Sequence, residues 1–272
     1  MKVITMVAWR RPDYFNEVIE SLKECIGIEN YIIYLSIDGG YPDKQVQMVD
    51  IIKQSGLNHK VHLCEENVGC AGNTKIALSM GFNEQDRVIH IEDDTVLHPD
   101  ALLWFEHNLL MYEHDNRIFS ISGYTNGRLN DKCVDGNWTE YNIIGIRDNF
   151  TCWGWATWKR VWDKMANKWF GSVWKENCSG ENCGYGEKFI QSIDKTDKGS
   201  WAWPMNKYWR NGRYEIAPHC SYIQNIGEED GMWATAMYQK YAHHTDWFNE
   251  ERRLNVEELD TFFIDDVLDN LK

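Results

Sequence analysis

The sequence predicts an α/β fold in which helices flank a mainly parallel sheet. Through residues 1–124, short β-branched runs alternate with amphipathic stretches of helical period, which is typical of consecutive βαβ units. Polar or acidic residues follow several of these runs, where the carboxyl ends of parallel strands meet and bind ligands. Periodicity weakens in residues 125–241, which we expect to complete the same domain.

Composition narrows the classes of function. The 272 residues carry a formal net charge of −14, which disfavours nucleic acid as a partner. The 8 cysteines contain no CxxC pair, so we expect free thiols in a reducing compartment, with a local clip between Cys178 and Cys183 as an alternative. No signal peptide or apolar run of about 18 residues is present, so a cytoplasmic protein without a transmembrane segment is expected.

The expected elements of the first half alternate regularly. Strands are predicted over residues 2–8, 31–37, 60–64, 88–91 and 118–123, and helices over residues 12–25, 44–55, 72–80 and 100–114. Residues 95–98 are expected to be a short link. Right-handed crossovers would place the carboxyl ends of these strands along one edge of the sheet.

Three consecutive acids, Glu92, Asp93 and Asp94, follow the fourth predicted strand. Burying such charges is unfavourable unless a positive group lies among them. A divalent cation is one solution, because Mg²⁺ and Mn²⁺ prefer oxygen ligands and share carboxylates with substrate phosphates. An acidic helix N-terminus is the structural alternative.

A nucleotide could bind at this edge, although the sequence lacks the glycine patterns of dinucleotide and P-loop proteins. Asp38 could accept a hydrogen bond from a base or a ribose hydroxyl. Arg10 or Lys75 could donate to phosphate. A solvated surface charge is the alternative for each of these residues.

Most of the 14 tryptophans lie in the second half. Indole rings beside hydroxyls and carboxylates suit the apolar faces of sugars, so Trp153 and Trp155 are candidates for binding an acceptor. Trp158 and Trp162, four residues apart, are expected to lie in the core. A helix over 200–210 and a strand over 213–217 complete the expected elements.

Several motifs together resemble a known family. They are Asp38, Glu66-Asn67-Val68-Gly69-Cys70, the acid triplet with His98-Pro99, the Trp-Gly-Trp segment within 150–158, Ser200-Trp201-Ala202 and Asn225-Ile226-Gly227. In this order they resemble the GT-A glycosyltransferases similar to N-acetylglucosaminyltransferase I, including compact relatives in bacteria and large viruses. The resemblance covers about residues 2–230.

The resemblance implies an inverting glycosyltransferase that uses a UDP-sugar and Mn²⁺ or Mg²⁺. In that family the last acid of the triplet binds the metal, which falls on Asp94, and the preceding two contact the ribose and the donor sugar. The acid after the second strand, here Asp38, holds the uracil. The loop corresponding to residues 67–75, which includes Asn67 and Lys75, runs beside the nucleotide.

For the catalytic base, the resemblance indicates a region of the sequence and leaves several acids as candidates. The family's base precedes the helix that Ser200 begins, which favours Asp197, then Asp194, and thirdly Asp230. Compact relatives often have a His after the segment matching Asn225-Ile226-Gly227, and this sequence has none there. His219 or His243 could substitute for it.

Two hypotheses follow from the sequence. The first is a metal-dependent transferase acting on a glycan acceptor, with the donor sugar, linkage and oligomeric state open. The second is a catalytically inactive GT-A-like carbohydrate-binding protein. The acidic tail, 242–272, is expected to dock on the domain formed by 1–124 and 125–241.

Overall fold

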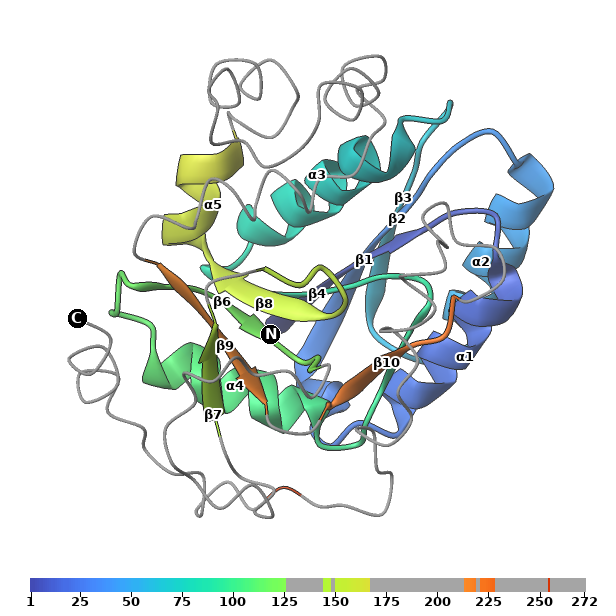
Figure 1. The fold of residues 1–272 in the computed structure, drawn as a ribbon. Helices are drawn as coiled ribbons and strands as arrows, with labels where there is room; N and C mark the ends of the chain where they lie inside the picture. Colours follow the sequence, from blue (N-terminus) through green and yellow to red (C-terminus); the bar gives the residue numbers. More distant parts are fainter. Residues whose placement is uncertain (126–143, 148–149, 167–212, 219–220, 228–253, 255–272) are drawn as a thin grey trace, which may run out of the picture.

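A computed structural model describes residues 1–125, 144–147, 150–166, 213–218, 221–227 and 254 (Figure 1). The described strands are β1 (Lys2–Ala8), β2 (Tyr31–Ile37), β3 (His59–Leu63), β4 (Arg87–Ile91), β5 (Thr95–Leu97), β6 (Ile118–Ser122), β7 (Ile144–Arg147), β8 (Trp155–Trp158), β9 (Tyr214–Pro218) and β10 (Ile223–Asn225). The helices are α1 (Pro12–Lys23), α2 (Pro42–Gln54), α3 (Gly69–Phe82), α4 (Ala101–Met111) and α5 (Lys159–Met165), with a 3₁₀ turn at Ile28–Asn30.

The described strands form an eight-stranded sheet in the order β3-β2-β1-β4-β8-β6-β9-β7, and a two-stranded sheet of β10 and β5. β1 pairs in parallel with β2 and β4, and β2 pairs in parallel with β3, whereas β8 is antiparallel to both β4 and β6. The carboxyl ends of β1, β2 and β4 therefore meet at one edge, which we call the carboxyl edge. The expected α/β class with a mainly parallel sheet flanked by helices is confirmed.

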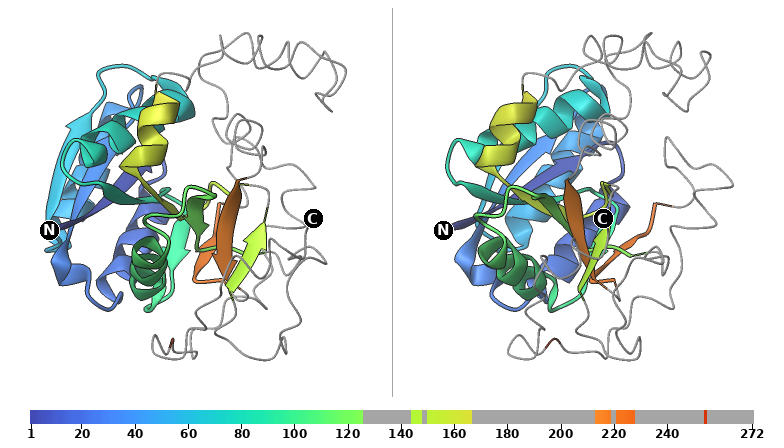
Figure 2. Two further views of the ribbon diagram at one scale, coloured as in Figure 1. Left: turned by 90° about the vertical axis from the view of Figure 1, so that its left-hand side faces the viewer. Right: turned by 60° about the vertical axis from the view of Figure 1, so that its left-hand side comes forward.

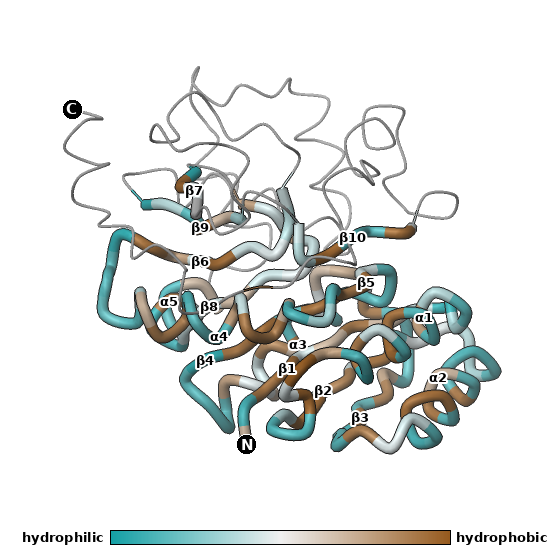
Figure 3. Tube along the Cα trace, turned by 90° about the horizontal axis from the view of Figure 1, so that it is seen from below, coloured by the Kyte–Doolittle hydropathy of each residue, from teal (hydrophilic) through white to brown (hydrophobic). Residues whose placement is uncertain are grey.

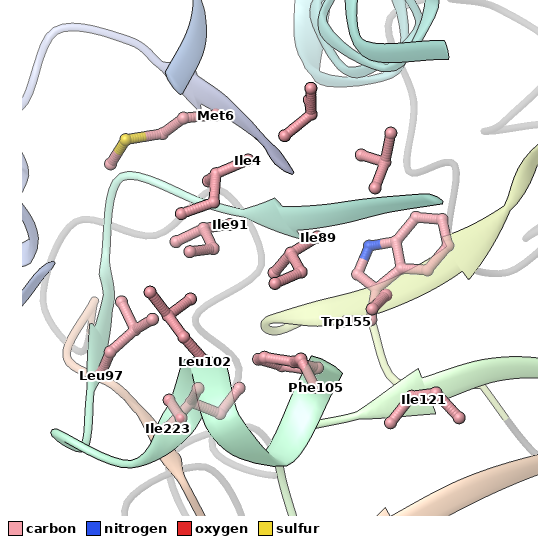
Figure 4. Close-up of a cluster of buried hydrophobic side chains, with 14 of the residues drawn as sticks. Ile4, Met6, Ile89, Ile91, Leu97, Leu102, Phe105, Ile121, Trp155 and Ile223 are labelled. Atoms are coloured by element: carbon pink, nitrogen blue, oxygen red, sulfur yellow. The ribbon is translucent and has the colours of Figure 1, made fainter. Parts of the chain in front are cut away.

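Helices cover both faces of the large sheet. α3 and α5 lie on one side, while α4 and the pair α1 and α2 lie on the other (Figures 1 and 2). Ile89 and Ile91 of β4 point toward Leu102 and Phe105 of α4, as Figure 4 shows. All four of these side chains are buried, so β4 is fixed by its hydrophobic face.

The hydropathy of the chain varies with its elements. In Figure 3, hydrophobic segments follow β1, β2 and β6, while the turns around α1 and α2 are hydrophilic. No helix among the described residues is both long and apolar enough to cross a membrane.

The sequence placed the N-terminal elements within a few residues but missed four short strands. Residues 95–97, expected to be a link, form β5, which pairs antiparallel with β10. β7, β8 and β10 were not predicted either. Trp158 ends β8 and precedes α5, so it does not share a helix with Trp162, although both side chains are buried in the core as expected.

Leu254, the only residue described beyond Gly227, belongs to the buried core. Its backbone N–H donates to the carboxylate of Asp100, which is itself buried at the start of α4.

Candidate active site

The acid triplet lies at the carboxyl edge, directly after the last residue of β4. Asp93 and Asp94 are 5% and 7% exposed, and Glu92 is half-buried. Ile91, the last residue of β4, is fully buried, so the acids that directly follow it also lie close to the core. Carboxylates this deeply buried require a compensating positive charge or hydrogen-bond donors.

Arg11 supplies that charge. Its Nη2 atom donates to Oδ1 of Asp93 and lies 2.8 Å from Oδ2 of Asp94. The Arg11 side chain is 17% exposed, so the guanidinium is largely enclosed by the same residues. Burial alone would lower the pKa of Arg11, but Asp93 and Asp94 outweigh it and raise that pKa above its ordinary value.

The three acids are electrostatically unequal. Burial raises the pKa of Asp93 to about 6, with Arg11 opposing the rise and Asp94 adding to it. The pKa of Glu92 is raised well above its ordinary value, first by burial and then by the charges of Asp94 and Asp93. Among the described residues, the Glu92 carboxylate has no hydrogen-bond partner. The cluster thus places three carboxyl groups around the single positive charge of Arg11.

The segment 225–227 encloses Asp94 from the side of the small sheet. Asn225, which is completely buried, donates from Nδ2 to Oδ1 of Asp94 at 2.9 Å. The N–H of Ile226 donates to the Asp94 carbonyl at 2.8 Å. At Gly227, a Cβ atom would lie 3.0 Å from Cγ of Asp94 and closer still to Oδ2. Pairing of β10 with β5 therefore sets where the Asp94 carboxylate points.

The loop after β1 completes the surroundings of Asp93. The N–H of Trp9 donates to Oδ2 of Asp93 at 2.9 Å, and the Trp9 indole donates from Nε1 to the carbonyl of Gly39 at 3.1 Å. Arg10 adopts a φ of +50°, a left-handed conformation that is uncommon for a residue with a side chain. Its guanidinium carbon lies 4.6 Å from the centre of the Trp9 ring. The turn therefore directs Arg10 over the indole and Arg11 toward the acids.

Asp38 organises the loop before α3. Its Oδ1 accepts from the N–H groups of Gly39 and Val68, and its Oδ2 accepts from the N–H of Gly69, at 2.8 to 3.0 Å. Gly39 approaches Glu66 so closely that a Cβ there would lie 2.6 Å from the Glu66 carbonyl oxygen. Asp38 thus holds the loop between β3 and α3 against the carboxyl edge.

A buried Asn joins α3 to the ends of two strands. Asn73 donates from Nδ2 to the carbonyls of Ser36 and Ala8, at 3.1 and 3.4 Å, and its Oδ1 accepts from the Ser36 hydroxyl at 2.6 Å. The side chain is 3% exposed. Hydrogen bonds of Asn73 therefore hold α3 against the ends of β1 and β2.

The remaining predicted residues are placed unevenly. Asn67 and Lys75 are half-buried, on the loop before α3 and nearly two turns into α3 respectively. Trp153 is half-buried, with its ring in edge contact with Tyr124 at 4.9 Å. The prediction for Trp155 is wrong, because it is fully buried among aromatic neighbours and its indole presents no surface to a sugar. Trp153 remains a candidate for an acceptor contact.

Five predicted residues lie outside the described residues. They are the candidate bases Asp197, Asp194 and Asp230, and the candidate metal or phosphate contacts His219 and His243.

The donor atoms at the triplet fit a hard cation that shares its ligands with a substrate. No group of three His, Cys, Asp or Glu side chains in the described part of the chain could hold a metal ion. An ion at Asp94 would therefore depend on phosphate oxygens, as Mg²⁺ sites commonly do. Cys152 is an unsuitable ligand, since burial and then the charge of Glu92 raise the pKa of its thiol well above the ordinary value.

Comparison with known proteins finds similarity in structure only. No family model and no curated protein matches the sequence. Solved structures that it resembles include glycosyltransferases. The galactosyltransferase LgtC, solved with donor and acceptor sugar analogues, is 11% identical, with 79% of this chain and 73% of that chain covered and a TM-score of 0.46.

Two further similar structures are less completely matched. The mannosyltransferase PcManGT from Pyrobaculum calidifontis, solved with GDP-Man and Mn²⁺, is 12% identical over 60% of this chain, with a TM-score of 0.44. TarS of S. aureus is 19% identical over 45% of this chain, with a TM-score of 0.37. The matches span 46% of PcManGT and 21% of TarS. Likeness at this level assigns neither a family nor an activity.

Sequence reasoning missed two residues of the site. Arg11, not Arg10, contacts the acids, and Asn225 contacts Asp94 across the small sheet. Arg11 directly precedes Pro12, the first residue of α1, but Arg10 lies in the same loop, so the sequence does not distinguish the two. Nothing local to Asn225 pointed to Asp94, because their contact depends on the pairing of β10 with β5.

Proposed function

We propose that this chain is an inverting glycosyltransferase that moves a sugar from a UDP-sugar to a hydroxyl of a glycan acceptor. The supporting observation is the buried acid triplet at the carboxyl edge, where open α/β sheets bind ligands. Three carboxyl groups around the single positive charge of Arg11, with the Glu92 carboxyl lacking a partner among the described residues, suit a cation and the polar groups of a nucleotide sugar. The motif order seen in the sequence supports the same reaction.

In this proposal the donor lies along the carboxyl edge. Asp38 and Asn67 border the base, and Glu92 and Asp93 accept hydrogen bonds from hydroxyls of the ribose and the donor sugar. Arg10 and Lys75 are the candidate cations for the phosphates. Asp38 retains capacity for this role, because each carboxylate oxygen can accept more than one hydrogen bond.

Asp94 is the residue that would hold Mn²⁺ or Mg²⁺. When bound, such an ion neutralises the diphosphate that leaves as UDP. Asn225 bonds to one oxygen of the Asp94 carboxylate, and Gly227 allows the backbone to pass close to the other. They therefore act as positioning residues for the proposed metal ligand.

On the acceptor side, Trp153 offers a ring for the apolar face of a sugar. Asp197, with Asp194 as the second choice, is proposed as the general base that removes the proton from the attacking hydroxyl. Inversion requires this base to lie on the face of the donor sugar opposite the leaving diphosphate.

Calorimetric titration with UDP, with and without Mn²⁺, tests the proposal. We expect Mn²⁺ to strengthen UDP binding, and Asp94→Asn to weaken UDP binding in Mn²⁺ by about tenfold or more, since a charged ligand is lost. Asp50→Asn, an exposed acid on α2, is the matched control and should bind UDP like the wild type. UDP affinity unaffected by both Mn²⁺ and Asp94→Asn would reject the metal-dependent mechanism.

A further inference from the structure

The guanidinium of Arg11 occupies the point between the two carboxylates that a cation at Asp94 would approach. Nη2 of Arg11 contacts one oxygen of Asp93 and one oxygen of Asp94. The other oxygen of each residue is taken by a neutral donor, the Trp9 N–H and the Asn225 side chain. All four carboxylate oxygens of Asp93 and Asp94 therefore already have a protein partner. Among these partners in the described part of the chain, only Arg11 is charged.

Removing Arg11 from this position without replacement would be unfavourable. Asp93 and Asp94 are nearly buried, and a buried charge pair that loses one partner is strongly destabilised. A divalent cation arriving alone would replace one charge with another but would leave the guanidinium without an acceptor. It would also find too few oxygens among the described side chains to complete its own coordination.

A diphosphate removes both difficulties. Its oxygens complete the coordination of the cation, and they also accept the planar guanidinium, which binds phosphate in a two-pronged geometry. The Arg11 side chain can reach such a ligand by rotating its own bonds, because it is 17% exposed and stands at the loop end of α1. Its backbone stays fixed, since the Arg11 carbonyl accepts from the N–H of Phe15 at 3.0 Å.

We propose that Arg11 and the divalent cation exchange at Asp94, and that the diphosphate of the donor drives the exchange. Without donor, Arg11 pairs with both Asp93 and Asp94 and excludes the cation. With donor, the cation binds Asp94 while Arg11 turns to the phosphate oxygens. This proposal rests on the proposed function. It adds Arg11 as a donor-binding residue and makes the affinity for the cation depend on bound nucleotide.

The test measures Mn²⁺ binding directly, from the loss of the electron paramagnetic resonance signal of free Mn²⁺, with and without UDP. For the wild type, we expect weak Mn²⁺ binding alone and binding about tenfold or more tighter with UDP. Arg11→Gln should bind Mn²⁺ without UDP about tenfold more tightly than the wild type, because the competing charge is gone. The same variant should gain less from UDP.

Lys23→Gln is the matched control, since it removes an equal charge from the exposed far end of α1, away from the acids. It should leave Mn²⁺ binding without UDP unchanged. If circular dichroism shows that Arg11→Gln does not fold, Arg11→Lys decides. A lysine ammonium is a single, strongly hydrated point charge, so it should exclude Mn²⁺ less well than arginine.

The outcomes separate the two proposals. Wild-type binding of UDP with Mn²⁺, combined with Mn²⁺ affinity unchanged in the folded Arg11 variants, would overturn the exchange and leave the proposed function standing. Equal effects of Lys23→Gln and Arg11→Gln would also overturn it, since a general charge effect would then explain the result. Absence of UDP binding in every protein would contradict the proposed function itself.

Discussion

At the scale of single residues, Gly227 leaves no space for a side chain beside Asp94. We predict that Gly227→Ala weakens UDP binding in Mn²⁺ by about tenfold or more, because the new methyl group would displace a carboxylate held by Arg11 and Asn225. Titration calorimetry measures this, and a thermal unfolding midpoint close to that of the wild type would show that the effect is local. Unchanged UDP affinity would show that the position of Asp94 does not matter for binding.

His90 gives a prediction about pH. The side chain is 1% exposed, and burial lowers its pKa from 6.5 to about 3. The folded state therefore keeps His90 neutral where the unfolded chain binds a proton, so its contribution to stability is complete above pH 6.5 and is lost as the pH falls toward 3. Each pH unit within this interval should remove about 1.4 kcal/mol from the free energy of unfolding.

Urea unfolding at about pH 7, 5.5 and 4.5 measures this dependence of stability on pH. His90→Asn should be less stable than the wild type at neutral pH, because it loses packing against Trp155, but its stability should fall less steeply with acid. His62→Asn, at an exposed position on β3, should follow the wild-type slope. Parallel curves for His90→Asn and the wild type would contradict the assignment of this slope to His90.

Single residues of the site differ in how far the sequence predicts them. The acid triplet could be recognised because three consecutive carboxylates after an apolar strand are unusual. Arg11 could not be separated from Arg10, because the left-handed backbone at Arg10 decides which guanidinium turns toward the acids. Trp155 could not be assigned to the core from sequence, because its burial depends on β8 lying between β4 and β6.

At the scale of elements, a buried charge network joins the far strands of the sheet. Glu215 of β9 is fully buried and accepts from Nε of Arg147 on β7 at 2.7 Å and from the hydroxyl of Ser120 on β6 at 2.6 Å. Burial raises the pKa of Glu215, while Arg147 opposes that rise. The network connects strands whose sequence positions are far apart.

We predict that Glu215→Gln lowers the free energy of unfolding by about 3 to 5 kcal/mol, because it leaves the Arg147 charge buried without a carboxylate. The double variant Glu215→Gln/Arg147→Met should lose less free energy of unfolding than the sum of the losses of the two single variants, since the pair is then removed together. Chemical unfolding of the two single variants and the double variant measures these losses. Glu20→Gln, which breaks the exposed pair with Lys23, should cost less than about 1 kcal/mol. Strict additivity of the first two changes would contradict the coupling.

Elements with a strong local pattern were predictable and short strands were not. β1, β2 and α1 have apolar residues at the expected spacing, and their ends were placed within a few residues. β5 has only three residues and forms because β10 pairs with it, so no local signal distinguishes it from a link. β7 likewise depends on β9 for its pairing.

At the scale of the whole molecule, the proposed function requires a chain of net charge −14 to bind an anionic donor against its own field. The proposed exchange would resolve this conflict at one edge of the sheet, because Arg11 and the cation there would share the acids and the phosphates. The alternation of strands and helices in the sequence was enough to predict this edge. The same alternation could not predict that Arg11 is the positive group beside the acids at the carboxyl edge.

The most direct test of the proposed activity is release of UDP from a panel of UDP-sugars in the presence of Mn²⁺. The panel should include the N-acetylglucosamine, glucose, galactose, xylose and rhamnose donors. We predict slow hydrolysis of at least one donor, lost in Asp94→Asn and retained in Asp50→Asn. Release of UDP from no donor by a protein that nevertheless binds UDP would contradict the proposed activity and would favour a carbohydrate-binding protein that retains the fold without catalysis.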